Sequence, residues 1–259
     1  MLKQLERFGR AAATGFCFAV FGTGQLILGF IAFPLLMLFT PKGEARKRLA
    51  KRGIQLSFRA FVELMRFCRV LDYRVDGTPK LKRSGLLVMA NHPTLIDVVF
   101  LIGFLPQADC VVKASLFRNP FIRFAITAAG YISNGQDPET VMAACQASFD
   151  AGNSLVIFPE GTRSTPGQPL TMQRGAAQIA VRCKRDMTPV LIFSSRHNIG
   201  KESKWWQVPE ERVQYRFDVQ DDLPIAPYIS GDQEPAMAAR KLTDFLTGYF
   251  NTRALSHAD

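Results

Sequence analysis

The chain has 259 residues, 47% of them hydrophobic, and a formal net charge of +10. This length allows one α/β domain with an appendage, and it excludes two full enzymatic domains. The charge is uneven, because residues 1–59 hold ten basic and two acidic side chains, a net +8. A nucleic-acid-binding protein would carry such charge on its folded domain among aromatic residues, so the distribution argues against a nucleic-acid partner.

The five cysteines are widely scattered and form no Cys-x-x-Cys pair. Their odd number and their spacing indicate neither a disulfide framework nor a zinc site. We expect them to be small, buried, apolar side chains in a protein of a reducing compartment.

An uncharged and mostly apolar stretch occupies residues 11–40. At about 1.5 Å per helical residue, this stretch exceeds the ~30 Å hydrocarbon core of a bilayer. Glycines and Pro34 interrupt it, so a kinked or re-entrant hairpin fits the sequence as well as one straight span. A cleaved signal peptide is disfavoured, because the run is about twice the usual length and leads into a basic block. We therefore predict membrane attachment.

Residues 1–71 are thus expected to form membrane-attachment helices with basic flanks, followed by an α/β domain over residues 72–259. Within the first part, residues 43–71 have the pattern of an amphipathic helix, which could lie at the membrane surface or pack on the domain. Basic residues beside a membrane segment favour the cytoplasmic side and attract anionic headgroups. The expected location is a bacterial-type inner membrane, with the domain facing the cytoplasm.

Short apolar runs and helical patterns alternate along the rest of the chain. Strands are predicted at residues 73–76, 86–90, 110–113, 131–133, 155–158, 189–194 and 213–219. Helices are predicted at residues 94–105, 117–129, 137–152, 174–182 and 235–250, with Asp137 as an N-cap. This alternation indicates an α/β fold with a mostly parallel sheet and flanking helices, preceded by the N-terminal hydrophobic segment.

Two polar segments directly follow predicted buried strands. Residues 91–97 read Asn-His-Pro-Thr-Leu-Ile-Asp, and residues 158–164 read Phe-Pro-Glu-Gly-Thr-Arg-Ser. Strand ends are where an α/β sheet gathers its reactive side chains. One end supplies an imidazole with a nearby carboxylate, and the other supplies a carboxylate, a hydroxyl and a guanidinium. Together they predict a group-transfer site.

Of the three histidines, only His92 stands at such a strand end with a carboxylate, Asp97, within reach. His197 lies in a predicted loop and His257 in a polar tail. The combination of His92-x4-Asp97 with Phe-Pro-Glu-Gly-Thr-Arg-Ser resembles the paired signature of the glycerolipid acyltransferases, the 1-acylglycerol-3-phosphate acyltransferase-like family. The resemblance covers roughly residues 70–220 and rests on both motifs in this order.

The resemblance implies a membrane-attached O-acyltransferase. Such an enzyme moves a fatty acyl group from acyl-CoA or acyl-carrier protein to a hydroxyl of a lysophospholipid such as 1-acylglycerol-3-phosphate. In this family the histidine is the general base, so His92 would take the proton of the acceptor hydroxyl while Asp97 orients the ring. Direct transfer fits the sequence, because no Gly-x-Ser-x-Gly nucleophile is present. No metal or tightly bound cofactor is implied, and the expected partners are membrane lipid and the thioester donor.

The resemblance also implies an acceptor-binding group in and near the second motif. Arg163 would grip a phosphate, and Glu160 would hold an acceptor hydroxyl or position Arg163. Gly161 and Thr162 could offer backbone N–H groups to the developing oxyanion. Lys113, which begins the segment that resembles the family's second block, would assist in acceptor binding.

One departure from the family pattern concerns the acceptor. The second block usually ends in an arginine that helps to bind the acceptor phosphate, and Asn134 stands at that place, with Arg118 and Arg123 nearby. This leaves open a different lipid-like acceptor, such as an aminolipid, a glycolipid or an intermediate of a specialised lipid or aryl-polyene pathway. Outside enzymes, a non-catalytic acyl-chain-binding membrane protein is the alternative. Chain length and the choice between CoA and carrier protein stay open as well.

Overall fold

The computed structural model describes residues 2–120, 122–165, 168–195, 211–229 and 234–255. Within these ranges a seven-stranded sheet has the order β1-β7-β6-β2-β5-β3-β4. Every neighbouring pair is parallel except β6 and β7, which are antiparallel. The strands are β1 Leu71–Asp76, β2 Leu87–Ala90, β3 Ala108–Val112, β4 Ile132–Ser133, β5 Ser154–Ile157, β6 Met187–Ser194 and β7 Val213–Val219. The predicted α/β fold with a mostly parallel sheet is confirmed.

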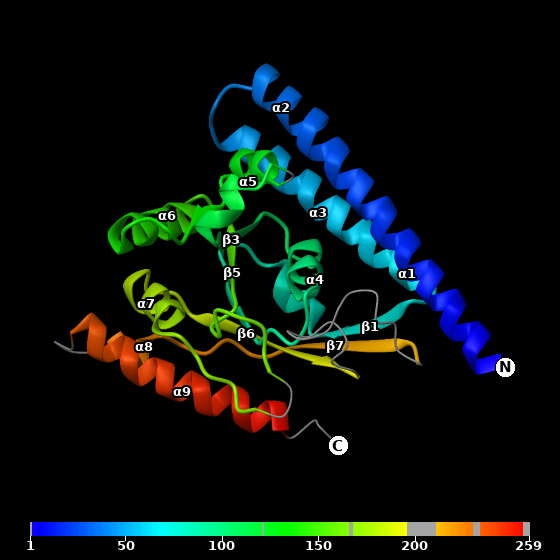
Figure 1. The fold of residues 1–259 in the computed structure, drawn as a ribbon. Coiled ribbons are helices and arrows are strands. Elements are labelled where there is room, and N and C mark those ends of the chain that lie inside the picture. Colours follow the sequence, from blue (N-terminus) through cyan, green and yellow to red (C-terminus); the bar gives the residue numbers. More distant parts are fainter. Residues whose placement is uncertain (1, 121, 166–167, 196–210, 230–233, 256–259) are drawn as a thin grey trace.

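Helices cover both faces of the sheet (Figure 1). One face packs against α3 Glu44–Phe67, α4 Asp97–Phe104 and α5 Arg123–Ala129. The other packs against α6 Pro138–Asp150, α7 Arg174–Arg182 and α9 Pro235–Leu255, with the short α8 Ala226–Ile229 beside α9. Strand β2 shows the period of two directly, because Val88 and Ala90 enter the first core while Leu87 and Met89 enter the second. A strand enclosed on both faces is apolar at every position, which is how β2 was recognisable in the sequence.

The apolar N-terminal stretch is a nearly continuous helix and does not fold back on itself. Helix α1 Leu2–Ile27 continues through a π-helical segment, Leu28–Ala32, into α2 Phe33–Phe39. The π-helical segment lies next to Pro34, whose ring nitrogen cannot donate to the carbonyl four residues earlier. The chain therefore does not turn back within residues 11–40, as a hairpin inside that stretch would require.

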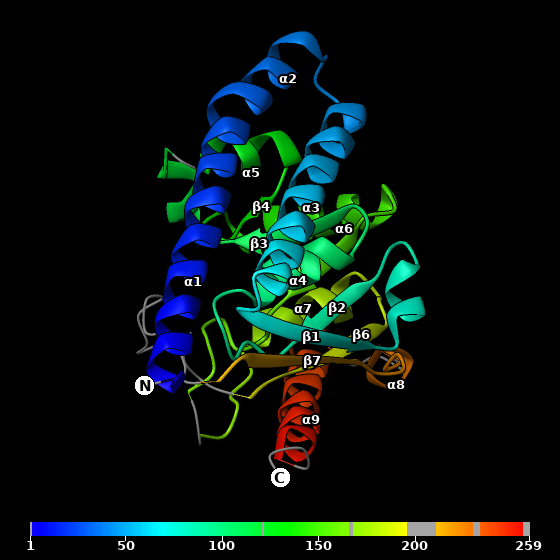
Figure 2. The ribbon, with the colours of Figure 1, turned by 90° about the vertical axis from the view of Figure 1, so that its right-hand side faces the viewer.

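The chain reverses after α2, and α3 returns antiparallel beside α1 (Figure 2). Phe21 of α1 stacks on Phe61 of α3, and Phe18 meets the same ring edge to face. Gln25 donates to the Ser57 hydroxyl one turn further along the two helices. The opposite side of α3 packs on α4 and α5. Of the two alternatives for residues 43–71, packing on the domain is the one observed, with α1 covering the outer side.

The helices predicted at residues 94–105, 117–129, 137–152 and 235–250 have different bounds in the structure, and the first two differences have a clear local cause. The helix expected from residue 94 begins at Asp97, because Thr94 and its neighbours form a turn whose amide donates to the Asp97 carboxylate. The helix expected at residues 117–129 is divided into a 3-10 helix, Ala114–Arg118, and α5. Pro120 lies between the two and cannot donate to a helical carbonyl. The Asp137 cap agrees with the prediction, since its carboxylate accepts the Thr140 amide at 3.0 Å.

Candidate active site

The two polar segments meet at one edge of the sheet. Strands β2 and β5 are parallel neighbours, so their carboxyl ends open side by side. A Glu160 oxygen accepts the His92 amide at 2.8 Å, and the Ser164 amide donates to the His92 carbonyl at 2.8 Å. The Phe158 ring stacks on the imidazole with 4.2 Å between centroids. Both halves of the sequence signature thus form a single cluster.

Asp97 holds the His92 ring. Nδ1 of His92 lies 2.9 Å from Oδ2 of Asp97, and Asp97 is wholly buried while 18% of the His92 side chain is exposed. The same carboxylate accepts the Thr94 amide at 2.6 Å and the Thr94 hydroxyl. An ionised carboxylate can only accept, so Nδ1 carries the proton and Nε2 is left as the acceptor. This is the arrangement of an oriented general base.

Burial and hydrogen bonding act in opposite directions on the two carboxylates of the cluster. Burial raises the pKa of Asp97, and the hydrogen bonds from His92 and Thr94 oppose that rise by favouring the charged form. Burial likewise raises the pKa of Glu160, opposed by the His92 amide and the Ser164 hydroxyl. The ionised state of each carboxylate therefore depends on donors supplied by the other residues of the site.

The backbone around His92 is fixed on both sides. Pro93 restricts the preceding residue to an extended conformation, which carries the chain out of β2 without a helical turn. The Asn91 carboxamide exchanges two hydrogen bonds with the backbone of Ile192 in β6, at 2.9 and 2.7 Å. These contacts tie the end of β2 to its neighbour on the side away from β5, so the position of the imidazole is set by three strands.

The residues of the second motif differ from one another in their contacts and exposure. The Glu160 carboxylate is directed at the His92 backbone, so it joins the two motifs. Gly161 has a φ of +67°, and its amide donates to the Phe158 carbonyl at 3.0 Å. That amide is engaged within the turn, and the oxyanion contact expected from Gly161 stays a prediction. Thr162 is exposed and Arg163 is half-buried in the same turn.

Asn134 has a structural role that the sequence did not reveal. Its side-chain oxygen accepts a hydrogen bond from the backbone amide of Ala114 at 3.1 Å. Its backbone amide donates to the Val112 carbonyl at 2.9 Å. The adjoining Gly135 approaches so closely that an added Cβ would lie 2.5 Å from Cβ of Ala114. Asn134 therefore joins the end of β4 to the turn that begins with the exposed Lys113.

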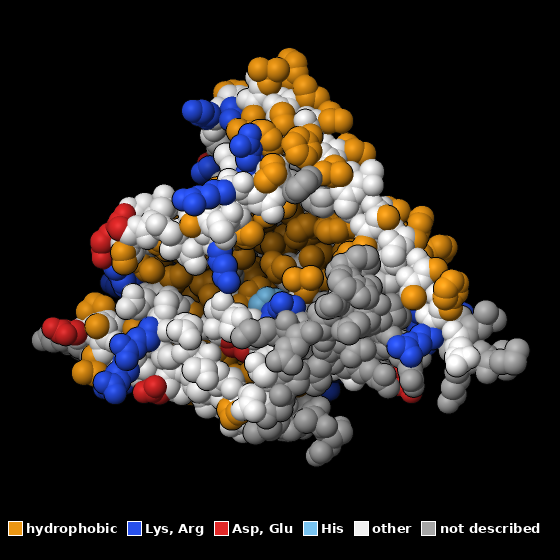
Figure 3. Space-filling model, viewed as in Figure 1, with side chains coloured by type: hydrophobic (Ala, Val, Ile, Leu, Met, Phe, Trp, Pro, Cys, Tyr) orange, Lys and Arg blue, Asp and Glu red, His pale blue; other side chains and the backbone are white. Residues whose placement is uncertain are grey.

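The imidazole lies at the edge of a hollow whose wall is apolar (Figure 3). The histidine in this view is His92, since His197 and His257 fall outside the described residues. Lysine and arginine side chains lie near the opening in this view. An apolar hollow with a base at its edge suits a ligand that has a hydrocarbon part and a polar reacting group.

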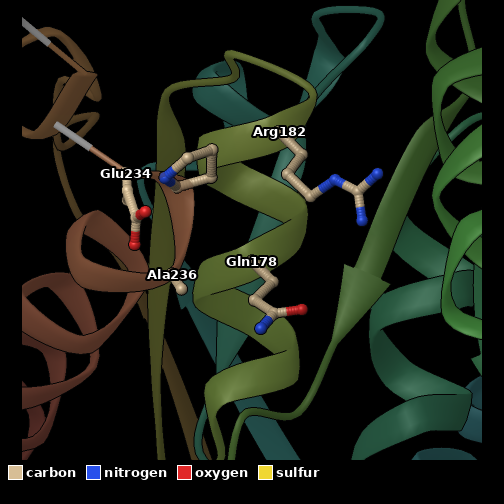
Figure 4. Close-up of a pocket in the computed structure, with 5 residues that line it drawn as sticks. Gln178, Arg182, Glu234 and Ala236 are labelled. Carbon is tan, nitrogen blue, oxygen red and sulfur yellow. The ribbon is translucent and has the colours of Figure 1, made fainter. Parts of the chain in front are cut away.

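A second pocket lies between α7 and the start of α9 (Figure 4). Its lining consists of Gln178, Arg182, Glu234, Pro235 and Ala236. Arg182 is already paired with Glu139 of α6. None of the residues predicted from the motifs lines this pocket.

Comparison with known proteins agrees with the motif resemblance. An acyltransferase family model matches residues 72–193, from β1 to β6. The 1-acyl-sn-glycerol-3-phosphate acyltransferase of Helicobacter pylori is 31% identical over 115 residues, which are 42% of this chain and 48% of that protein. The corresponding protein of Borreliella burgdorferi is 26% identical over 154 residues, 55% of this chain and 61% of its own length. The chain thus spans about half of the first relative's length and about three fifths of the second's.

A solved structure extends the comparison to the whole fold. The crystal structure of the 1-acyl-sn-glycerophosphate (LPA) acyltransferase PlsC from Thermotoga maritima matches with a TM-score of 0.65 and 17% identity, over 95% of this chain and 97% of that one. At this identity the likeness concerns the fold. The family model and the curated relatives match the region that holds both motifs, so residues 72–193 carry an acyltransferase domain that is similar to the 1-acyl-sn-glycerol-3-phosphate acyltransferases.

Proposed function

We propose that this protein is an O-acyltransferase that moves a fatty acyl group from a thioester, either acyl-CoA or acyl-carrier protein, to a hydroxyl of a lysophospholipid such as 1-acylglycerol-3-phosphate. The observation that carries the proposal is the His92–Asp97 pair, 2.9 Å apart, with a wholly buried carboxylate and an imidazole partly exposed at an apolar hollow. The names of the relatives support the class of reaction.

The reaction needs one proton to move twice. As the acceptor oxygen attacks the thioester carbonyl, its proton passes to Nε2 of His92 and the new C–O bond forms. The tetrahedral intermediate then expels the thiolate. The thiolate accepts this proton from the imidazolium, and the products are an ester and a free thiol. Asp97 keeps Nδ1 as the donor and stabilises the imidazolium between the two transfers. The stacked Phe158 keeps one face of the ring away from water.

The acceptor would bind beside the second motif. Arg163 offers a planar, bidentate donor for a phosphate, and Lys113 adds an exposed cation from the turn after β3. We propose that Glu160 acts mainly by holding the His92 backbone, given the 2.8 Å contact, and that Thr162 contacts the acceptor from the same turn.

A second candidate keeps the reaction and changes the acceptor. Asn134 occupies the place of the usual phosphate-binding arginine, and its carboxamide is engaged with the Ala114 amide. Each missing charge-assisted phosphate contact would weaken binding by about 1.5–3 kcal/mol. This observation favours a lipid-like acceptor without a free phosphate, such as an aminolipid or a glycolipid.

We further propose that residues 1–71 attach the protein to a membrane and that residues 72–259 carry the chemistry. The helical stretch Glu6–Phe39 is long and apolar enough to cross a membrane, and only 17% of its most apolar window is buried. Its inner side, however, is occupied by α3. Attachment along the outer side, with the hairpin lying on or dipping into one leaflet, fits this packing better than a free span. The basic flanks support a bacterial-type inner membrane and a cytoplasmic domain.

The reaction is tested with the purified full-length chain in detergent micelles. Thioester consumption is followed with lysophosphatidic acid, a lyso-aminolipid and a glycolipid as acceptors, and products are identified by mass spectrometry. We expect an acylated acceptor that disappears in His92→Ala. Turnover with a phosphate-free acceptor alone would select the second candidate. Donor binding without turnover, or turnover that survives in His92→Ala, would contradict the proposal.

Attachment is tested on the outer side of the hairpin with vesicles that contain anionic lipid. Leu35, Leu38 and Phe39 are exposed on α2, so changing all three to serine should reduce co-sedimentation without disturbing the α1–α3 packing. Phe67→Ser is the matched control, because Phe67 is also exposed but ends α3 at the other end of the hairpin. Equal sedimentation of the triple variant and the control would move attachment elsewhere.

A further inference from the structure

Thr94 supplies two of the three hydrogen bonds that Asp97 receives among the residues that the structure describes. Its backbone amide donates to Oδ2 of Asp97 at 2.6 Å, and its hydroxyl donates to Oδ1. The third donor is Nδ1 of His92, which shares Oδ2 with the amide. Thr94 and Asp97 are both wholly buried. Apart from the proposed base itself, Thr94 is therefore what compensates the carboxylate for its burial.

Helix capping does not account for the Thr94 hydroxyl. Residues 94–97 have the Thr-x-x-Asp spacing of a capping box, in which the hydroxyl accepts the amide of the third residue further on. In this structure the hydroxyl donates to the Asp97 carboxylate. Helix α4 begins at Asp97, with Ile96 rather than Thr94 in the cap position. The hydroxyl thus serves the carboxylate and not the end of the helix.

The same pair of donors occurs at the surface, where it has a purely structural use. The amide and the hydroxyl of Thr140 donate to the two oxygens of Asp137, and both residues are exposed at the start of α6. The Thr140 hydroxyl, with its amide, lowers the pKa of Asp137. Burial raises the pKa of Asp97, and the bonds from His92 and Thr94 oppose that rise. Water can replace a lost donor at Asp137, whereas the buried Oδ1 of Asp97 has no such substitute.

We propose that Thr94 is a positioning residue for acyl transfer, whose hydroxyl holds Oδ1 of Asp97 and thereby directs Oδ2 to Nδ1 of His92. The inference rests on the proposed function, because the hydroxyl acts through the proposed base. A carboxylate held at one oxygen by a hydroxyl and at the other by an amide cannot rotate without breaking both bonds. It also stays charged, which is the state that stabilises the imidazolium formed when the acceptor loses its proton.

The first test compares Thr94→Val with Thr94→Ser in the full-length chain. Valine keeps the shape of the side chain and the backbone donor but removes the hydroxyl, so we expect kcat to fall about tenfold. The KM values for thioester and acceptor should stay within about twofold, because the change acts on the base and not on binding. Serine keeps the hydroxyl and should retain kcat within about threefold. A valine variant that is as fast as the serine variant would overturn the proposal.

A role in packing alone predicts the opposite order of rates. Thr94→Ser removes a buried methyl group and leaves a small cavity, whereas valine fills the site. If packing of the turn set the rate, serine would be the slower variant. Should Thr94→Val not fold, Thr94→Ser against Thr94→Ala decides, since these two differ only by the hydroxyl. We expect alanine to be the slower by about tenfold, and equal rates would refute the role of the hydroxyl.

Thr140→Val is the matched control. It removes the same kind of bond, from a threonine hydroxyl to an aspartate, at the exposed start of α6. We expect a lower Tm and a kcat within about twofold of the wild type, because neither Thr140 nor Asp137 contacts the site. A loss of kcat in Thr140→Val equal to that in Thr94→Val would show that the assay reports stability, and the proposal would fall.

A further measurement does not depend on turnover. In protein labelled with ¹⁵N-histidine, the ring nitrogens of His92 are identified by their loss in His92→Ala, and their shifts report which nitrogen holds the proton. At about pH 8, where an ordinary imidazole is neutral, we expect the proton on Nδ1 in the wild type, in Thr94→Ser and in Thr140→Val. In Thr94→Val the two shifts should approach each other, because the aspartate selects the tautomer less strictly.

This measurement separates the inference from the proposed function. A wild type that acylates no acceptor would contradict the proposed function, and the ring nitrogens would still report on Thr94. Unchanged shifts in Thr94→Val would refute the role of Thr94 even in an active acyltransferase.

Discussion

Two buried aspartates, Asp97 and Asp109, have similar surroundings in this structure. Asp97 accepts hydrogen bonds from His92 and from the Thr94 hydroxyl. Asp109 of β3 accepts from Lys51 of α3, at 2.8 Å, and from a serine hydroxyl of α6. Burial raises the pKa of both carboxylates, and the basic partner opposes the rise in each case.

The difference lies in what the basic partner can reach. The Lys51 side chain is 2% exposed, so its pair with Asp109 is enclosed and serves to join the N-terminal hairpin to the sheet. His92 is partly exposed at the hollow and keeps one nitrogen as an acceptor. A buried carboxylate with a basic partner is therefore not by itself a sign of catalysis. The sign is a partner that can exchange a proton with something outside the protein.

The largest expected effect is the difference in kcat between variants of the two aspartates. Asp97→Asn should lower kcat at least about a hundredfold, because an amide neither stabilises the imidazolium nor selects the Nδ1 tautomer. Asp109→Asn should retain kcat within about threefold per folded molecule, since Asp109 contacts no residue of the site. Steady-state rates on protein corrected for the folded fraction give the comparison. Comparable losses in both variants would remove the distinction.

The next prediction compares the free energy of unfolding after loss of Lys51 and after loss of His92, the basic partners of the two aspartates. Lys51→Met leaves the Asp109 carboxylate buried without its cation and should lower the free energy of unfolding by about 3–5 kcal/mol. Replacing both residues, as Lys51→Met with Asp109→Leu, should recover most of that loss. His92→Ala should cost less than Lys51→Met, since water can reach the exposed side of the site. Urea unfolding of the variants at one pH measures all of these values, and a double variant as unstable as Lys51→Met would show that the pair is not the cause.

The pH dependence of stability sharpens the comparison further. An acid whose pKa is raised by folding binds more protons in the folded than in the unfolded state, between its ordinary pKa near 4 and the raised value. The free energy of unfolding therefore falls as pH rises through this window, by at most about 1.4 kcal/mol per pH unit for one group. Asp109→Asn should remove this contribution, so its stability should decline less than that of the wild type from about pH 4 upward. Parallel curves from urea unfolding across the range would contradict the assignment.

The smallest expected effects come from the hydroxyl donors. Ser148→Ala removes the serine donor of Asp109 and should lower stability by about 1 kcal/mol with no change in kcat. Ser164→Ala removes a donor of Glu160, 2.9 Å away, and should cost a similar amount while also lowering kcat, because Glu160 holds the His92 amide. Thermal unfolding and initial rates distinguish the two variants. A normal rate in Ser164→Ala would show that Glu160 holds the His92 amide without the Ser164 hydroxyl.

From its own pattern the sequence determined the class of fold, the order of strands and helices along the chain, and the two motifs at strand ends. These features are local: apolar runs of four to eight residues predict buried strands, and Asp137 before Pro138 marks a helix start. The pairing of His92 with Asp97 was accessible for the same reason, since five residues and one turn separate them.

Only the tertiary structure decided which distant groups would meet. Lys51 and Asp109 are 58 residues apart, and neither carries a local signal of burial in a charged pair. The ring of Tyr215 lies 5.1 Å from that of Phe100 because β7 pairs antiparallel with β6, which no periodicity specifies. One sign of it was present, a phenol at a buried position of the alternating strand Val213–Val219. Local steric and hydrophobic preferences act between near neighbours, whereas these contacts depend on how whole elements pack, and packing is a property of the complete fold.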